Sequence, residues 1–341
     1  MLSWTSGVVE RWARIVAIAG VMLASVCTGP AHAGEAASSE PALTVDALSV
    51  VKVHAHAVKD ARSSSTLGAD REGTGVVVDE KGLVLTIGYL IIEADNVQLS
   101  TADGKRYPAT IVGYDSRTGL GLLRALTPLP VKPVDFGVSS KAAARDLVLI
   151  VGFDGVAPAY IVSKRPFVGY WEYLLEEAIY TAPATVNWQG AALLDREGKL
   201  LGIGSLAVND AMGAHTHVPG NVFLPIDALK PVLGELIAKG AISARPRPWL
   251  GVNTLDVQGH LIVTRVSPDS PAEAAGLVRG DLIVGVAGQP IKGQADFYLH
   301  VWARGDAGVD VPLDVLKGNR IEQYTVKSIA REEYYNAKPV Y

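Results

Sequence analysis

The segment TGVVVDEKGLVLTIGYLI, residues 74–91, decides the fold, because it predicts two apolar strands joined by a tight turn at residues 79–82. Residues 97–115, VQLSTADGKRYPATIVGYD, repeat this design around a turn at Asp103 and Gly104. Further short apolar strands are predicted at residues 119–126, 146–153, 160–164, 191–206 and 220–226. Many short strands at a spacing of about ten residues predict an antiparallel barrel or sandwich.

The pattern changes after these strands. Residues 226–240, IDALKPVLGELIAKG, have helical periodicity, with Leu229 and Leu236 on the apolar face and Gly240 as the predicted C-cap. Two prolines and two arginines then mark residues 241–248 as a linker.

A small α/β unit is predicted after the linker. It begins with two strands, continues through a short helix started by Ser270 and Pro271, and includes a second helix at residues 295–305. We therefore expect a first domain at residues 48–240, a second at residues 249–330 and a tail at residues 331–341.

The N-terminus has the features of a secretory signal. Arginines flank an apolar run at residues 15–26 that is short for a membrane span, and AHA at residues 31–33 supplies small residues for cleavage. We predict cleavage after Ala33, a flexible leader at residues 34–47, and a periplasmic or secreted protein with no stable membrane span. A lipoprotein signal at Cys27 is the alternative, although the preceding Val26 is bulkier than expected there.

Length, charge and cysteine content restrict the possible classes of function. A length of 341 residues is enough for two or three domains with their own cores. The formal net charge of −4, without a basic cluster, predicts no nucleic-acid partner. The single cysteine lies in the signal segment, so the exported chain would rely on core burial rather than disulfides.

Four stretches together carry a family resemblance. They are GTGVVVDEKGLVLT (73–86), LSTADGKRYPATIVGYDSRTGLGLLRA (99–125), ALLDREGKLLGI (192–203) and, within residues 249–291, the pattern WLGV, SPAEAAGL and GDLIVGVAGQPI. In this order they resemble the HtrA/Deg family of exported bacterial serine proteases. The resemblance implies a mostly β protein: a trypsin-like double antiparallel β-barrel followed by a C-terminal α/β PDZ domain.

The same resemblance implies that the catalytic triad is degenerate. TIGYL places Tyr89 at the family histidine, and DSRTGLGLL places Gly119 at the family aspartate. Counting back from Leu194 places Gln189 at the serine, whereas counting forward from residues 179–183 places Gly190 there. A phenol with an ordinary pKa near 10 is a poor general base, and neither loop candidate is a nucleophile. We therefore expect the protease frame without an intact catalytic residue.

The second domain retains a stronger functional signal. Trp249, Leu250, Gly251 and Val252 resemble the loop and strand that receive a peptide C terminus in PDZ domains. In the following helix, we expect Phe297 and Val301 in the core, and Tyr298 and Trp302 on an adjacent face bordering the groove. The alternative is a PDZ-like domain used only for intramolecular or oligomer contacts.

Two histidine pairs are candidate metal ligands. His54 and His56 lie two apart on a predicted strand, and His215 and His217 have the same spacing in a loop. Zinc sites use three or four ligands, and no Cys, Glu or Asp cluster accompanies either pair in the sequence. We therefore predict surface histidines, no metal and no cofactor.

Three functional hypotheses follow from the sequence. The first is an exported HtrA-like pseudoprotease that binds peptides or unfolded segments through its PDZ domain as an adaptor, regulator or holdase. The second is an active serine-type endopeptidase of envelope protein quality control with replaced chemistry. The third is a structural subunit that assembles with an active HtrA paralogue. A homo-oligomer is compatible with each of them.

Overall fold

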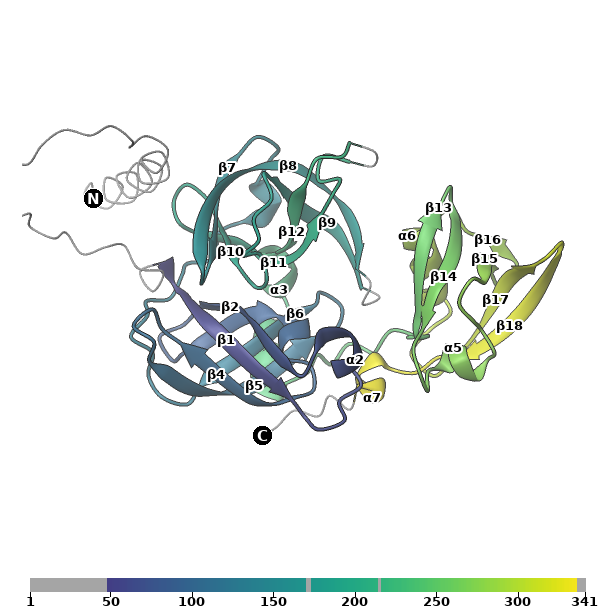
Figure 1. The fold of residues 1–341 in the computed structure, drawn as a ribbon, viewed down its shortest axis with the longest axis horizontal. Coiled ribbons are helices and arrows are strands. Elements are labelled where there is room, and N and C mark those ends of the chain that lie inside the picture. The colour runs from purple at the N-terminus through teal and green to yellow at the C-terminus, as the bar shows by residue number, and fades with distance from the viewer. Residues whose placement is uncertain (1–47, 170–172, 214–215, 336–341) are drawn as a thin grey trace, which may run out of the picture.

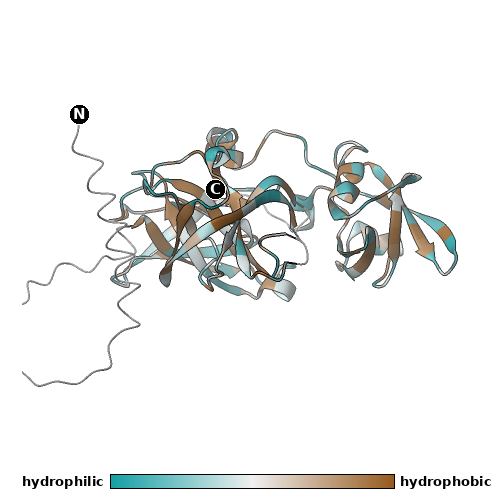
Figure 2. Cartoon of the chain, turned by 90° about the horizontal axis from the view of Figure 1, so that it is seen from above, coloured by the Kyte–Doolittle hydropathy of each residue, from teal (hydrophilic) through white to brown (hydrophobic). Residues whose placement is uncertain are grey.

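The computed structural model describes residues 48–169, 173–213 and 216–335, which form two closed β-barrels and a separate sheet (Figure 1). The predicted signal segment and leader lie outside these residues. Seen from above, the two barrels make up one end of an elongated molecule and the separate sheet makes up the other (Figure 2). The predicted fold class, trypsin-like barrels followed by a smaller α/β domain, is confirmed.

The first barrel has the strand order β1-β2-β3-β6-β5-β4. Its strands are β1 (Val50–Ala57), β2 (Asp70–Val77), β3 (Leu83–Ile87), β4 (Ala94–Ser100), β5 (Arg106–Asp115) and β6 (Leu120–Ala125). The turn between β2 and β3 forms because the Asp79 carboxylate accepts hydrogen bonds from the N–H groups of Lys81 and Leu83. This is the hairpin that the sequence predicts. A short helix, α2 (Ser64–Leu67), and a 3₁₀ turn, η2 (Gly88–Leu90), interrupt the barrel wall.

The second barrel has the strand order β10-β11-β12-β9-β8-β7. Its strands are β7 (Leu147–Gly152), β8 (Gly155–Gly169), β9 (Tyr173–Ala182), β10 (Ala192–Leu194), β11 (Leu200–Val208) and β12 (Gly220–Pro225). A 3₁₀ turn, η3 (Ser139–Lys141), precedes it. The barrel interior is apolar, with side chains such as Leu193 and Phe223 fully buried.

The helix predicted at residues 226–240 is divided in two. The structure has α3 (Ile226–Leu229) and α4 (Leu233–Lys239), separated around Pro231, which lacks a backbone N–H for a helical hydrogen bond. Gly240 caps α4 in the left-handed conformation and donates its N–H to the Leu236 carbonyl, as the sequence predicts.

The C-terminal sheet has the order β13-β14-β15-β17-β18, with β16 paired to β15. Its elements are β13 (Val252–Val257), β14 (His260–Val266), α5 (Pro271–Ala274), β15 (Leu282–Val286), β16 (Gln289–Pro290), α6 (Gln294–Trp302), β17 (Asp310–Lys317) and β18 (Arg320–Lys327). Ser270 caps α5 through its side chain, and Pro271 occupies the first turn, both as predicted.

The tail expected at residues 331–341 begins with a helix. This helix, α7 (Arg331–Tyr334), lies beside α2 of the first barrel (Figure 1). Tyr334 and Tyr335 pack with Trp249 of the second domain and Ile92 of the first barrel in one apolar cluster. The chain therefore returns to the first barrel after completing the C-terminal sheet. No helix within the described ranges is long and apolar enough to cross a membrane.

Candidate active-site region and peptide groove

Tyr89 lies at the junction of the two barrels. Its hydroxyl donates a 3.0 Å hydrogen bond to the Ser205 carbonyl of β11 in the second barrel. Its own carbonyl accepts a bond from the buried guanidinium of Arg71, which also bonds to the Ile92 carbonyl. The phenol that the sequence predicts at the family histidine position is thus held as a structural link between the barrels.

Gly119 lies next to the turn that carries Tyr89. The Gly88 N–H donates to the Gly119 carbonyl at 2.7 Å, and the Gly119 N–H donates to the Asp115 carbonyl at 2.8 Å. Gly119 has a φ of +81°, which glycine adopts without strain. The structure therefore brings the positions expected for the histidine and the aspartate together, but Gly119 offers no side chain there.

The loop after β9 is bonded to both barrels through its backbone. The Gln189 carbonyl accepts a 2.8 Å bond from the Thr74 N–H of β2, and the Gly190 N–H donates to the Gly204 carbonyl of β11. Gly190 has a φ of +72°, and a Cβ there would lie 2.1 Å from the Thr74 carbonyl oxygen. Of the two loop candidates for the serine position, only Gln189 can carry a side chain.

Asp115 is the acidic side chain next to Gly119. It is buried, and its carboxylate accepts bonds from the Thr118 hydroxyl at 2.6 Å and from the Arg117 N–H at 3.0 Å. Burial raises the pKa of Asp115 despite these hydrogen bonds. The carboxylate is therefore committed to its own turn rather than to Tyr89.

The second domain presents an edge strand. Among the described strands, β13 pairs only with β14, so its other side is open to strand addition. Helix α6 runs beside this side, and the Gln294 side-chain amide at its start lies 3.4 Å from the Thr254 carbonyl. The predicted groove would therefore lie between this edge strand and helix α6.

The loop before β13 is fixed from inside the domain. Gly251 has a φ of +83°, and its carbonyl accepts a 2.8 Å bond from the Ser267 N–H. The Leu250 carbonyl accepts a bond from the Ala272 N–H of α5. Leu250 and Val252 are buried in the core of the domain, whereas Trp249 is buried in the separate cluster with Ile92, Tyr334 and Tyr335.

The predicted assignment of α6 side chains to the core and to the groove is wrong for one residue. Phe297 and Val301 are core residues, as expected, but Tyr298 is equally buried, with 2% of its surface exposed. Its ring stacks on Trp302 at a centroid distance of 5.5 Å, and the Arg247 guanidinium lies 4.0 Å from the Trp302 ring centroid. Of the predicted pair, only the partly exposed Trp302 lies at the surface.

The first histidine pair lies on β1 in two separate side-chain pairs. His54 lies 2.9 Å from Glu72, and His56 lies 2.7 Å from Asp70. His217 is exposed, whereas His215 lies outside the described residues. In the part of the chain that the structure describes, no three His, Cys, Asp or Glu side chains are arranged to hold a metal ion.

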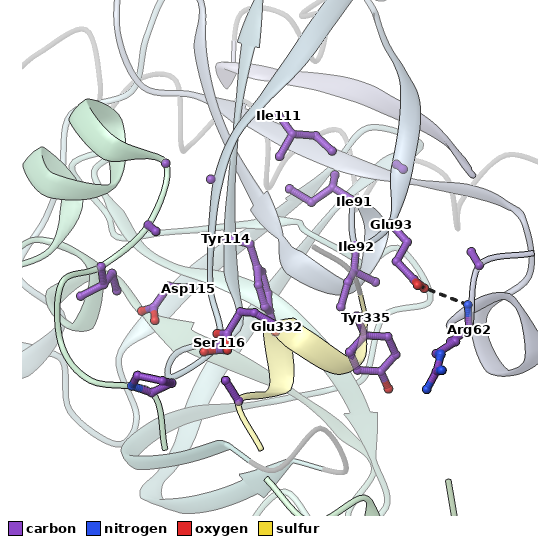
Figure 3. A pocket seen from close by; sticks show the side chains of 18 of the residues that line it. Arg62, Ile91, Ile92, Glu93, Ile111, Tyr114, Asp115, Ser116, Glu332 and Tyr335 are labelled. Carbon is purple, nitrogen blue, oxygen red and sulfur yellow. Dashed lines mark hydrogen bonds between the residues drawn. The ribbon is translucent and has the colours of Figure 1, made fainter. Parts of the chain in front are cut away.

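A cavity of about 610 Å³ lies between the first barrel, the linker and α7. Ile91, Ile92 and Ile111 line it from the barrel, and Tyr335 faces them from the C-terminal segment (Figure 3). Its lining includes Asp115 but not Tyr89, Gly119 or either loop candidate, so it adjoins the active-site region only on the Asp115 side.

Comparisons with known proteins agree with this architecture. Residues 73–203 match the trypsin-like peptidase domain family, and residues 262–317 match the PDZ domain family. A solved structure of a variant of the HtrA-type protease AlgW with a tripeptide aligns over 84% of this chain and 94% of that one, with a TM-score of 0.50 and 22% identity. That likeness concerns the fold.

Three relatives show the extent of the similarity. The chain is 27% identical to the putative serine protease HhoA of Synechocystis, covering 75% of this chain and 70% of HhoA. It is 30% identical to a probable periplasmic serine endoprotease, DegP-like, of Marinomonas, covering 70% and 53%. It is 25% identical to the serine protease Do-like HtrA of Bacillus subtilis, covering 80% and 67%. The alignment thus spans about half of the DegP-like relative.

A trypsin-like peptidase domain followed by one PDZ domain defines the class of this protein. With relatives named HtrA, HhoA and DegP-like over most of the described residues, the chain belongs to the HtrA family.

Proposed function

We propose that this chain is an exported HtrA-like protein that lacks peptidase activity and binds peptide C termini or unfolded segments through its PDZ domain. The observation that carries the proposal is the hydrogen bond from the Tyr89 hydroxyl to the Ser205 carbonyl. A general base must present a free acceptor to its nucleophile. At this position a phenol instead donates a hydrogen bond to a backbone carbonyl of the opposite barrel.

The other two triad positions support the same proposal. Gly119 offers no carboxylate to orient a base, and Gln189 offers an amide where the reaction needs an activated hydroxyl. The backbone bond between Gln189 and Thr74 also fixes the loop against the first barrel. A triad acts as a unit, so we expect no activity after restoring any one of the three side chains.

A fluorophosphonate label and cleavage of unfolded casein test this part of the proposal. We expect neither labelling nor cleavage above background from the purified chain, and none from the single changes Tyr89→His, Gly119→Asp or Gln189→Ser. Cleavage that co-purifies with the chain and is blocked by the label would overturn it. The relatives are named as serine proteases, which favours the alternative hypothesis of an active endopeptidase with replaced chemistry.

Peptide binding is the positive half of the proposal. The open side of β13 and the adjacent α6 support strand addition, in which main-chain hydrogen bonds supply most of the recognition. Micromolar affinity is expected for a short peptide, corresponding to about −8 kcal/mol. Amidation of the peptide terminus should weaken binding at least about tenfold. Equal binding of amidated and free-acid peptides would exclude carboxylate capture.

Assembly and location complete the proposal. We propose export to the periplasm on the basis of the N-terminal segment, and the DegP-like relatives are themselves described as periplasmic. A chain without its own activity could act beside an active HtrA paralogue. Co-purification of such a paralogue from the envelope fraction would support a regulatory subunit, whereas a homo-oligomer alone would favour the adaptor or holdase role.

A further inference from the structure

A row of aliphatic side chains crosses the whole C-terminal sheet. The strands β13, β14, β15, β17 and β18 follow one another across this sheet (Figure 1). Register partners on successive strands form one continuous row, which consists of Leu255, Ile262, Leu282, Leu316 and Ile321. Directly paired residues of antiparallel strands project from the same face of a sheet. We call these five side chains the aliphatic stripe.

The aliphatic stripe projects away from the core of the domain. Its neighbours along the strands, Leu261, Ile283 and Val315, are fully buried in that core. Successive side chains of a strand point to opposite faces of the sheet, so the stripe lies on the outer face. Antiparallel sheets with one solvated face usually carry polar side chains on it. A row of five aliphatic residues on the outer face departs from that pattern.

The two ends of the aliphatic stripe are open to solvent. Leu255 on β13 is 51% exposed, and Ile321 on β18 is 65% exposed. The three residues between them are partly buried, and none of the three is among the side chains that pack against the domain core. Exposed polar side chains lie two positions away along β14 and β18, namely His260, Thr264 and Gln323. An apolar strip with a polar rim is the usual composition of a surface that binds another polypeptide.

The size of the aliphatic stripe decides which kind of partner fits it. Neighbouring strands lie about 4.8 Å apart, so the stripe is about 19 Å long and covers on the order of 100–200 Å². A stable complex of folded proteins buries roughly 800 Å² on each partner, which is far more than the stripe offers. An extended chain advances about 3.3 Å per residue, so about six residues span the stripe. The stripe therefore matches one extended segment rather than a second folded copy.

We propose that the aliphatic stripe binds extended, apolar segments of unfolded polypeptides, as a second peptide site on the PDZ domain. The proposal rests on the proposed function, because it concerns the same binding of unfolded segments. It adds a selection for aliphatic side chains, which the carboxylate capture expected at the groove does not supply. Burial of these side chains is the driving force, so the interaction needs neither a free C terminus nor a charged group.

The aliphatic stripe is distinct from the proposed peptide groove. The groove lies at the open edge of β13 beside α6, where the Gln294 side chain lies 3.4 Å from the Thr254 carbonyl. The Thr254 side chain is buried and alternates with that of Leu255, so it points to the other face of the sheet. Ile321 lies on β18, at the opposite edge of the sheet from the groove. A change at Ile321 can therefore test the stripe without touching the groove.

A cavity separates the aliphatic stripe from the first barrel. It has a volume of about 350 Å³, and its lining includes Arg62, Arg265 and Arg331. Asn253, two positions before Leu255 on β13, also lines it. The stripe thus lies further along β13 than the part of the domain that meets the first barrel and α7.

Fluorescence anisotropy with a labelled peptide tests the proposal on the purified chain. The peptide is acetylated and amidated, which removes any contribution from carboxylate capture, and it carries leucine at alternate positions. A matched peptide carries serine in place of leucine. We expect saturable binding of the leucine peptide and at least about tenfold weaker binding of the serine peptide, because each leucine side chain gains free energy when it leaves water.

Variants of the chain assign this binding to the aliphatic stripe. Ile321→Ser should weaken the affinity for the leucine peptide at least about fivefold, and Leu255→Ser provides a second variant at the other end. Leu126→Ser is the control, because this side chain is 60% exposed on the first barrel and loses a similar aliphatic surface. A polar peptide with a free C-terminal valine probes the groove instead. It should bind the unchanged chain and Ile321→Ser equally.

The possible outcomes separate the aliphatic stripe from the groove. Equal affinities of Ile321→Ser and Leu126→Ser for the leucine peptide, or equal binding of the leucine and serine peptides, would overturn the proposal. A dimer in analytical ultracentrifugation that Ile321→Ser dissociates would assign the stripe to a second copy and would also overturn it. Binding of the leucine peptide that depends on Ile321, without binding of the valine peptide, would support the stripe and contradict carboxylate capture at the groove.

Discussion

The junction between the barrels and the edge of the PDZ sheet differ in what holds them. At the junction, backbone groups of residues 189 and 190 bond to strands of both barrels, and the Tyr89 hydroxyl bonds across to Ser205. At the PDZ edge, β13 has one strand neighbour among the described residues, and its other side faces α6. The first region is closed by its own hydrogen bonds, whereas the second offers a ladder for another chain.

On the proposed function, this difference would explain why one kind of site survives the loss of side chains. Peptidase chemistry depends on three particular side chains in one geometry, so Tyr89, Gly119 and Gln189 at the proposed triad positions would leave it without its means of reaction. Strand addition depends mainly on backbone groups, which nearly every sequence supplies. A family member can therefore lose the first function and retain the second without changing its fold.

The largest effect is expected from Gly190→Ala at the closed junction. Its Cβ would lie 2.1 Å from the Thr74 carbonyl oxygen at a φ of +72°, so overlap adds to backbone strain. We expect a loss of at least about 3 kcal/mol in the free energy of unfolding, or no folded protein. Gly104→Ala is the control, with a φ of +79° and no atom within 4 Å, and should cost about 1 kcal/mol. Equal costs in urea titrations would show that the junction is not tightly packed.

The next effect concerns the loop at the open edge. In Gly251→Ala, the added Cβ would lie 2.4 Å from the Ser270 Cβ, so the loop must shift away from its present course. We expect peptide affinity to fall at least tenfold, equivalent to about 1.4 kcal/mol. Gly288→Ala, in the same domain with a φ of +78° and no close atom, should bind normally. Fluorescence titration of a labelled peptide measures the affinity of both variants. Comparable losses of affinity would show that peptide binding does not depend on this loop.

A smaller effect is expected from Tyr89→Phe. The change removes the hydroxyl that bonds to the Ser205 carbonyl and keeps the ring that packs against the core. We expect about 1 kcal/mol of destabilisation, as for one lost internal hydrogen bond. Tyr160→Phe, on a side chain that is 53% exposed, should change stability by less than about 0.5 kcal/mol. If both changes cost the same, the cross-barrel bond is not a stabilising link.

The smallest effect needs no mutation. Amide hydrogens of β13 should exchange faster than those of β3, which is paired on both sides by β2 and β6. A saturating peptide should slow exchange in β13 and leave β3 unchanged. Exchange mass spectrometry resolves the two segments. Slow exchange in β13 before peptide addition would contradict an open edge.

Local signals in the sequence predicted much of the fold. Asp79 and Gly104 mark turns that the structure forms, and Ser270 and Pro271 start α5 as expected. The predicted single helix failed at Pro231, where the missing N–H outweighed an otherwise helical pattern. Tyr298 was expected at the groove and is buried; helix α6 contacts β8 of the second barrel as well as β13 and β15, and helical periodicity does not signal such long-range contacts.

The sites were predicted less completely. The sequence motifs single out Tyr89 and Gly119, and the structure places these two residues in neighbouring turns. Motif spacing alone could not choose between Gln189 and Gly190 for the serine position. The structure adds only that the backbone around Gly190 leaves no room for a side chain. The cavity lined by Arg62, Arg265 and Arg331 had no sequence signal, because these residues come from distant segments and one belongs to the expected tail. Only tertiary structure brings such residues together.

Helix α7 has a mechanical consequence for the PDZ domain. The linker and the packing of Tyr334 and Tyr335 against Trp249 and Ile92 both join the domain to the first barrel. Helix α6 also contacts β8 of the second barrel, where Val168 packs against the core of the domain. A body attached at three separate places cannot turn about one axis unless an attachment breaks. The peptide groove should therefore keep one orientation relative to the barrels, and cutting the chain before Arg331 would remove one of the three attachments.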